Sequence, residues 1–163
     1  GRVFDFAVRF IKNLRESGRR VLFFTNNASH NPEYYYDKLR RIGFDPQDGE
    51  ILTSGDVTVE FLKSHRPGKP VYLVGTPELE RQFTESGITH SDSADIVVTS
   101  FDTTLTYKKL DTACRLVRNG AEYLSTHPDF NCPTALQGEN LTFTFPNAIR
   151  QPPRHTYPRL AFR

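Results

Sequence analysis

Apolar positions along the chain fall into two patterns, short unbroken runs and longer stretches with helical spacing. The clearest run is VLFF at residues 21–24. It predicts a strand within a parallel sheet, with both faces of the strand buried. Before it, apolar residues within the stretch 3–17 recur at helical spacing, and Gly18 supplies a stop. The chain is therefore expected to open with a helix followed by a buried strand.

The two patterns continue to alternate downstream. Asn31, Pro32 and Glu33 have the preferences of an N-cap, a first helical position and a first-turn acid, respectively. Later helices are predicted to begin at Ser54, at residues 76–78 and at Thr106. Further strands are predicted at residues 51–53, 71–74, 95–99 and 123–126. Strands that alternate with helices indicate parallel βα units, so the predicted fold class is α/β.

Proline and glycine divide the chain into three parts. The segment HRPGKP at residues 65–70 interrupts the alternation and is typical of a linker or hinge. It separates an expected first unit, residues 1–66, from a second α/β unit, residues 67–134. Residues 135–163 carry four prolines and scattered arginines with neither strand nor helix periodicity. We expect this tail to be irregular, and possible sources are a non-homologous or out-of-frame end.

Charge and composition exclude several classes of function. The net charge of +2 comes from the tail, which holds four arginines and one glutamate, so the rest is close to neutral. Because no predicted helix carries a basic stripe, we expect no nucleic-acid partner. No apolar run is long enough to span a membrane, and no signal-peptide pattern is present. Two isolated cysteines favour neither a disulfide framework nor a zinc site, which suits a reducing cytoplasm.

Polar residues end the VLFF run at the point where a ligand is expected in a parallel sheet. Thr25, Asn26 and Asn27 follow the run directly, and ligands of open α/β sheets bind beyond the carboxyl ends of the strands. Hydroxyl and amide groups can hold an anion there. On this stretch alone, an ordinary polar turn after a strand is the simpler interpretation.

Five segments occur in an order that resembles a known family. They are TNN after VLFF, then ILTSGDV, VYLVGTPEL, DIVVTSFDTTLTYKKL and RNGAEYLSTHPDFNCPT. This order is similar to that of haloacid dehalogenase (HAD) superfamily phosphatases, in the branch of 4-nitrophenylphosphatases and sugar-phosphate phosphatases. The resemblance covers about residues 3–134. It implies a partial Rossmann-like core in residues 1–66 and an inserted α/β cap domain in residues 67–134.

The resemblance also implies an activity, the Mg²⁺-dependent hydrolysis of phosphomonoesters through an aspartyl-phosphate. Thr25 matches the hydroxyl that holds the phosphoryl group, and Asn26 and Asn27 match the polar pair that follows it. His127, Asp129 and Asn131 match the cap loop that helps to select the leaving group. The expected partner is a small phosphorylated metabolite in the cytoplasm, and the interpretation allows a homodimer through the cap.

Several parts of the family's machinery are missing from this sequence. The family nucleophile lies in an Asp-x-Asp-Gly-Thr motif upstream of the first helix, and no Asp-x-Asp occurs in these 163 residues. The family's lysine and metal-binding acids follow the cap, whereas no lysine follows Lys109 and no aspartate follows Asp129. A chain that starts at Gly1 and lacks methionine is interpreted as a fragment without either end of the core. We therefore expect no catalytic residue and no metal ligand here, and no activity from the chain alone.

Two alternatives remain open. The segment FDTTLT at residues 101–106 looks like a degraded nucleophile motif, but it lacks the second aspartate and the glycine, so we predict a turn that leads into a helix. The whole chain can also be interpreted as a non-catalytic α/β binding or self-association module.

Overall fold

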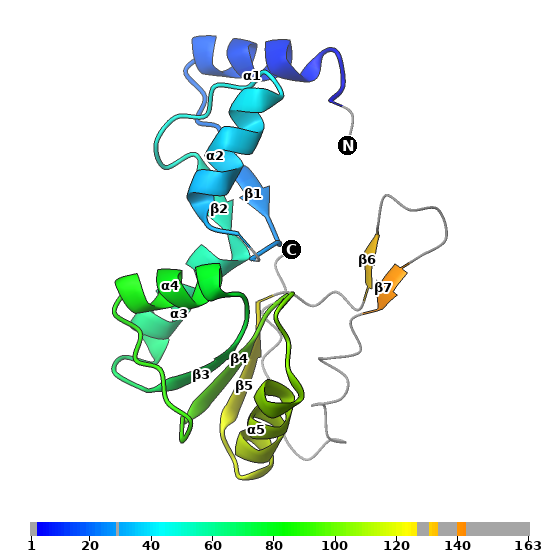
Figure 1. Cartoon of the computed structure of the whole chain (residues 1–163). Coiled ribbons are helices and arrows are strands. Elements are labelled where there is room, and N and C mark those ends of the chain that lie inside the picture. Colours follow the sequence, from blue (N-terminus) through cyan, green and yellow to red (C-terminus); the bar gives the residue numbers. More distant parts are fainter. Residues whose placement is uncertain (1–2, 29, 127–130, 134–139, 143–163) are drawn as a thin grey trace.

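The computed structural model describes residues 3–28, 30–126, 131–133 and 140–142. Figure 1 shows the arrangement of its elements. In chain order they are α1 (Ala7–Glu16), β1 (Phe23–Thr25), α2 (Pro32–Arg41), β2 (Ile51–Thr53), α3 (Ser54–His65), β3 (Val71–Val74), α4 (Pro77–Glu85), β4 (Ile96–Thr99), α5 (Tyr107–Arg118), β5 (Glu122–Ser125), β6 (Asn131–Pro133) and β7 (Asn140–Thr142). The predicted α/β class is confirmed, since helices alternate with strands β1 to β5, which pair in parallel within two separate sheets. No helix in the described part is long and apolar enough to cross a membrane.

The first sheet consists of β1 and β2, which pair in parallel with Phe23 opposite Ile51 and Thr25 opposite Thr53. Burial alternates along β1, since Phe24 is 53% exposed while both of its neighbours in the strand are half-buried. That alternation is typical of a strand covered on one face only. The prediction of burial on both faces is therefore wrong for the described chain, because the face that carries Leu22 and Phe24 is more than half exposed.

Helix α1 forms within the predicted stretch but begins later, at Ala7 rather than at residue 3. Its apolar residues keep helical spacing, yet none of its side chains is buried, and Phe6 and Phe10 are more than half exposed. A helix normally gains its stability from packing such a face against a neighbour. The apolar face of α1 thus lacks that cover within the described residues.

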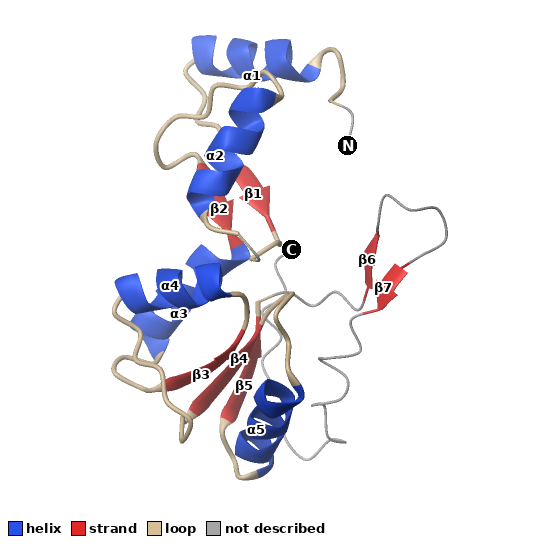
Figure 2. Cartoon of the chain, viewed as in Figure 1, coloured by secondary structure: helices blue, strands red, loops and turns tan. Residues whose placement is uncertain are grey.

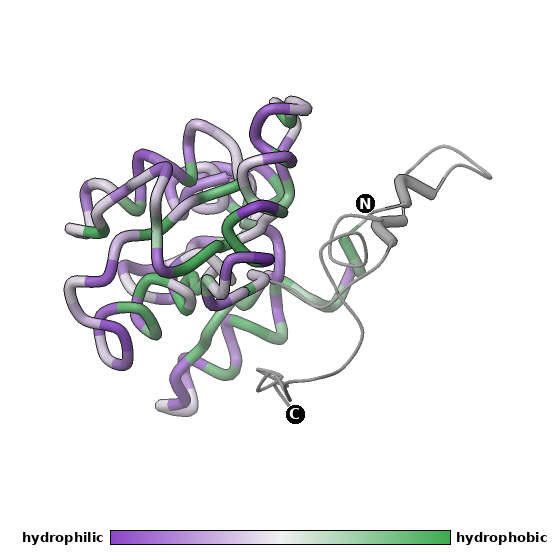
Figure 3. Tube along the Cα trace, turned by 90° about the horizontal axis from the view of Figure 1, so that it is seen from below, coloured by the Kyte–Doolittle hydropathy of each residue, from purple (hydrophilic) through white to green (hydrophobic). Residues whose placement is uncertain are grey.

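The second sheet has the strand order β3-β4-β5 with all strands parallel. Figure 2 shows α3 and α4 on one side of this sheet and α5 on the other. Helices α4 and α5 thus pack on opposite faces of the sheet, with Phe83 and Ala113 buried in separate clusters. Hydrophobic stretches run through the interior of this part, and its outer turns are largely hydrophilic (Figure 3).

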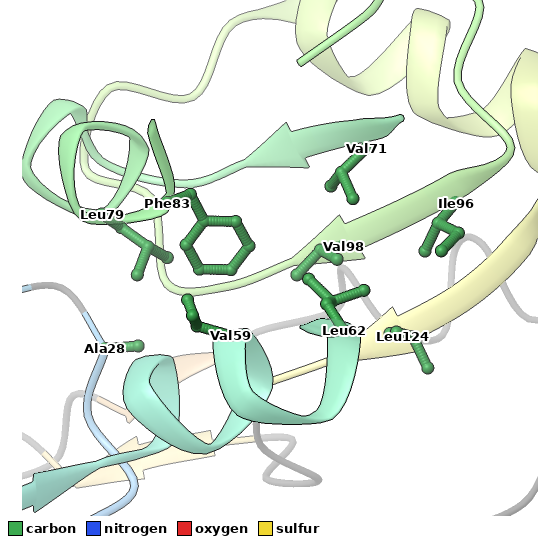
Figure 4. Close-up of a cluster of buried hydrophobic side chains, with 9 residues drawn as sticks. All are labelled: Ala28, Val59, Leu62, Val71, Leu79, Phe83, Ile96, Val98 and Leu124. Carbon is green, nitrogen blue, oxygen red and sulfur yellow. The ribbon is translucent and has the colours of Figure 1, made fainter. Parts of the chain in front are cut away.

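Helix α3 packs on the second sheet, although the expected domain division assigned it to the first unit. Val59 and Leu62 lie in one buried cluster with Val71 and Ile96 of the second sheet (Figure 4). The helix is capped by Thr53, one residue before the predicted Ser54. The division at residues 66 and 67 stays a prediction, because packing alone does not show which segments fold independently.

A short hairpin follows the second sheet, where β6 and β7 pair antiparallel with Asn131 opposite Thr142. The expected irregular tail therefore contains one strand, Asn140–Thr142, which corrects that prediction. The physical reason is backbone pairing across the hairpin, which a residue-by-residue search for periodicity does not detect. The remaining residues of the stretch 135–163 lie outside the described part of the chain.

Candidate functional site

Thr25, Asn26 and Asn27 form a tight turn at the carboxyl end of β1. Thr25 is the last residue of the strand, and the backbone N–H of Asn27 donates to its Oγ1 at 3.2 Å. Thr25 is half-buried, whereas Asn26 and Asn27 are exposed. The turn therefore presents one hydroxyl and two side-chain amides at the edge of a parallel sheet, where ligands of α/β folds bind.

Two hydroxyl groups hold the backbone of this turn. Ser54 Oγ, at the first position of α3, donates to the carbonyl oxygen of Asn26 at 2.8 Å. Tyr35 Oη, on α2, donates to the carbonyl oxygen of Asn27 at 3.3 Å. Burial raises the pKa of Tyr35 to about 12, and a hydrogen bond with Thr25 opposes part of that rise. The phenol thus remains a neutral donor at physiological pH.

Helices α2 and α3 both begin beside the turn. Asn31 caps α2 by accepting from the N–H of Tyr34 at 3.2 Å, as the sequence predicted. Thr53 caps α3 in a capping box with Asp56, whose N–H donates to Thr53 Oγ1 at 3.1 Å. Helix N-termini carry partial positive charge and favour nearby anions. The two helix starts therefore bring partial positive charge close to the turn, and the first-turn acids Glu33 and Asp56 offset part of it.

A cleft of about 250 Å³ lies nearby, between the starts of α2 and α3 and one side of α4. Its charged lining residues are mostly acidic: Glu33, Asp56, Glu78 and Glu85, with Arg81 as the single base. An anionic substrate would be repelled from such a lining. The cleft is therefore a poorer phosphate site than the turn.

The described residues do not form a site for the magnesium ion that the sequence resemblance implies. No group of three or more histidine, cysteine, aspartate or glutamate side chains converges anywhere in the described part of the chain. Magnesium is held in proteins mainly by carboxylate oxygens. Within the part of the chain that the structure describes, the side chains thus do not fit that metal.

Asp102, the aspartate of the degraded motif, is fully engaged in local contacts. Its carboxylate accepts from the N–H of Thr104 at 2.8 Å and from Lys109 Nζ at 2.7 Å. Lys109 Nζ also donates to the carbonyl oxygen of Gly75 at 3.1 Å. The Asp102 side chain is only 2% exposed, so no substrate reaches it in this arrangement. These contacts are those of a turn that leads into α5, as the sequence predicted.

The cap-loop residues cannot be placed beside the turn. His127 and Asp129 lie outside the described residues, and Asn131 is described only as the backbone of β6. Their role in selecting a leaving group stays a prediction.

Sequence reasoning missed the supporting roles of Tyr35 and Ser54. Helical spacing after Asn31 places Tyr35 on the inner face of a helix, and Ser54 is predicted only as the start or cap of the next helix. Tyr35 offered a signal, because a tyrosine on the inner face of a helix carries a hydroxyl that requires a hydrogen-bond partner when it is buried. What the sequence could not give was the partner, because Ser54 lies 28 positions from Asn26.

Comparison with known proteins finds relatives in the family that the sequence resembles. The family described as haloacid dehalogenase-like hydrolase matches residues 1–89. An acid sugar phosphatase of Staphylococcus aureus (strain USA300) is 37% identical over 131 residues, which are 79% of this chain and 51% of that protein. The chain thus spans about half the length of the curated relatives it matches.

Solved structures give the same result. A 4-nitrophenylphosphatase from Thermotoga maritima superposes with a TM-score of 0.84 at 35% identity, covering 92% of this chain and 60% of that one. A double mutant of a thermostable NPPase from Geobacillus stearothermophilus superposes with a TM-score of 0.82 at 32% identity, covering 90% and 60%. These two structures, at 35% and 32% sequence identity, thus share the fold of this chain along most of its length.

Proposed function

Because the chain belongs to the haloacid dehalogenase-like hydrolases, we propose that the whole protein hydrolyses phosphomonoesters of the sugar-phosphate or 4-nitrophenyl phosphate type. One observation carries the proposal: the Thr25–Asn27 turn lies at the carboxyl end of β1, beside the starts of two helices. The acid sugar phosphatase and 4-nitrophenylphosphatase relatives support the choice of substrate class.

Each residue of the turn has a distinct role in this proposal. The Thr25 hydroxyl donates to one phosphoryl oxygen, and the amides of Asn26 and Asn27 orient the group from the exposed side. Orientation alone supplies no attacking group, and the 163-residue sequence contains no Asp-x-Asp. We therefore expect this chain by itself to bind phosphate without turning over a phosphomonoester.

Two measurements on the 163-residue chain test the proposal. Titration with inorganic phosphate should shift the amide resonances of Asn26 and Asn27, and Thr25→Ala should weaken that binding. Thr84→Ala, which removes a hydroxyl on the exposed side of α4, serves as a matched control and should leave binding unchanged. The absence of any phosphate-dependent shift in the wild type would refute the proposed site.

The activity assay is the second measurement. The purified chain should release no nitrophenolate from 4-nitrophenyl phosphate, with or without Mg²⁺. Turnover that depends on Mg²⁺ and disappears in Asp102→Asn would instead identify Asp102 as the nucleophile. In a protein restored with an upstream Asp-x-Asp segment and a C-terminal core, activity should appear. Thr25→Ala should then lower its rate about a hundredfold, as expected for the loss of one oxyanion donor.

A second candidate function is self-association without catalysis, with the cap as the contact surface. Leu105 and Tyr107, at the start of α5, are 45% and 84% exposed, and exposed apolar side chains of this kind are frequent in protein contacts. Sedimentation of the wild type and of Tyr107→Ser over a range of concentrations distinguishes a cap dimer from a monomer. A reducing cytoplasmic location is part of both candidates, since the sequence offers no disulfide framework.

A further inference from the structure

We propose that Tyr35 and Ser54 are positioning residues that set the geometry of the Thr25–Asn27 turn for phosphate. The inference rests on the proposed function of that turn and adds two residues outside it. Neither residue is part of the expected phosphate contact, and each acts through the backbone of Asn26 or Asn27.

The turn is fixed at both of its ends by packing and pairing. At one end, Thr25 is held in the first sheet opposite Thr53. At the other end, Ala28 is fully buried and lies in the hydrophobic cluster with Val59 and Leu79 (Figure 4). Three peptide groups join these two ends, and two of them carry the carbonyls of Asn26 and Asn27.

The two hydroxyls hold those two peptide groups one each. Ser54 Oγ binds the carbonyl of Asn26 at 2.8 Å, and Tyr35 Oη binds the carbonyl of Asn27 at 3.3 Å. In a planar trans peptide, the direction of the carbonyl also fixes the direction of the next N–H. The first bond therefore helps to direct the Asn27 N–H onto Thr25 Oγ1. Together the two bonds determine where the side chains of Asn26 and Asn27 leave the backbone.

Tyr35 holds the Asn27 carbonyl from a buried position. The residue is 9% exposed, and its hydroxyl donates to that carbonyl at 3.3 Å. Removing the Tyr35 hydroxyl thus releases the Asn27 carbonyl. This change loosens the turn without removing any group that touches phosphate.

The next residue of the same helix provides a matched control. Tyr36 Oη donates to the carbonyl of Gln47 at 3.2 Å and accepts from the N–H of Gly49 at 2.9 Å. It thus holds a different loop by the same kind of bond. Ser64, at the far end of α3, donates to Glu60 at 2.8 Å and is the corresponding control for Ser54.

The experiment compares the full 163-residue wild type with Tyr35→Phe, Ser54→Ala, Tyr36→Phe and Ser64→Ala. Each is titrated with inorganic phosphate while the amide resonances of Asn26 and Asn27 are recorded, and each is melted separately. Tyr35→Phe and Ser54→Ala should each weaken phosphate binding about fivefold, the effect of one lost hydrogen bond. Tyr36→Phe should lower the melting temperature as Tyr35→Phe does while leaving phosphate affinity unchanged.

The outcomes separate this inference from the proposed function. Equal phosphate affinity in wild type, Tyr35→Phe and Ser54→Ala would overturn the positioning roles while the phosphate site stands. An equal loss of affinity in Tyr36→Phe would also overturn them, because it would show general destabilisation. A wild type that binds no phosphate would overturn the proposed function itself.

Discussion

Truncating Leu62 to alanine should destabilise the protein by about 3 kcal/mol. Leu62 is 2% exposed and packs from α3 onto the second sheet, in a cluster with Val71, Ile96 and Leu124. The substitution removes three buried carbons, worth about 2.4 kcal/mol at roughly 0.8 kcal/mol each. The remaining cavity adds to this, so the total falls within the range of about 2–5 kcal/mol that is typical of such changes.

Urea unfolding followed by far-UV circular dichroism measures this effect. Leu22→Ala is the matched control, since Leu22 is 58% exposed and should cost less than about 0.5 kcal/mol. Amide exchange in Leu62→Ala should accelerate at Val97 and Val98 in β4 and remain unchanged at Phe24 in β1. A cost no larger than that of Leu22→Ala, or faster exchange confined to β1, would show that α3 is not packed on the second sheet.

Three further predictions follow from particular contacts. Asp56→Ala should cost about 1–2 kcal/mol in urea unfolding, because it removes the capping box of α3 and a partner of Gln82, whereas exposed Asp37→Ala should be nearly neutral. The raised pKa of Tyr35 stabilises the fold below pH 10, and this stability should be lost between pH 10 and about 12, where the unfolded phenol ionises first. Tyr35→Phe should remove that alkaline step, worth at most about 3 kcal/mol, and an unchanged alkaline profile would contradict the assignment. Wild type should aggregate readily through its uncovered apolar faces, and Phe24→Lys should raise the soluble fraction measured after centrifugation; equal soluble fractions would exclude β1 as the cause.

Local chemistry in the sequence was sufficient to predict most of the helix starts. Asn31, Thr76 and Thr106 each accept a hydrogen bond from the N–H three positions later, a contact that depends on neighbouring residues alone. Short apolar runs likewise predicted β2 and β3 at the residues where they form. These signals act over a few positions, so they can be read before any long-range contact is known.

Burial and the support of the candidate site were decided by the tertiary structure. The run at residues 21–24 predicted a strand but did not predict which elements would pack on its two faces. Phe24 is exposed because its face of the strand is largely uncovered within the described residues. The side chains of α3 suited a buried helix face, yet only packing determined that they meet the second sheet rather than the first. The sequence likewise placed Thr25, Asn26 and Asn27 after a strand, but the contact of Ser54 with Asn26 spans 28 positions. A hydrogen bond of that separation exists only because β1 and β2 pair in one register, which brings the turn after β1 next to the first residue of α3.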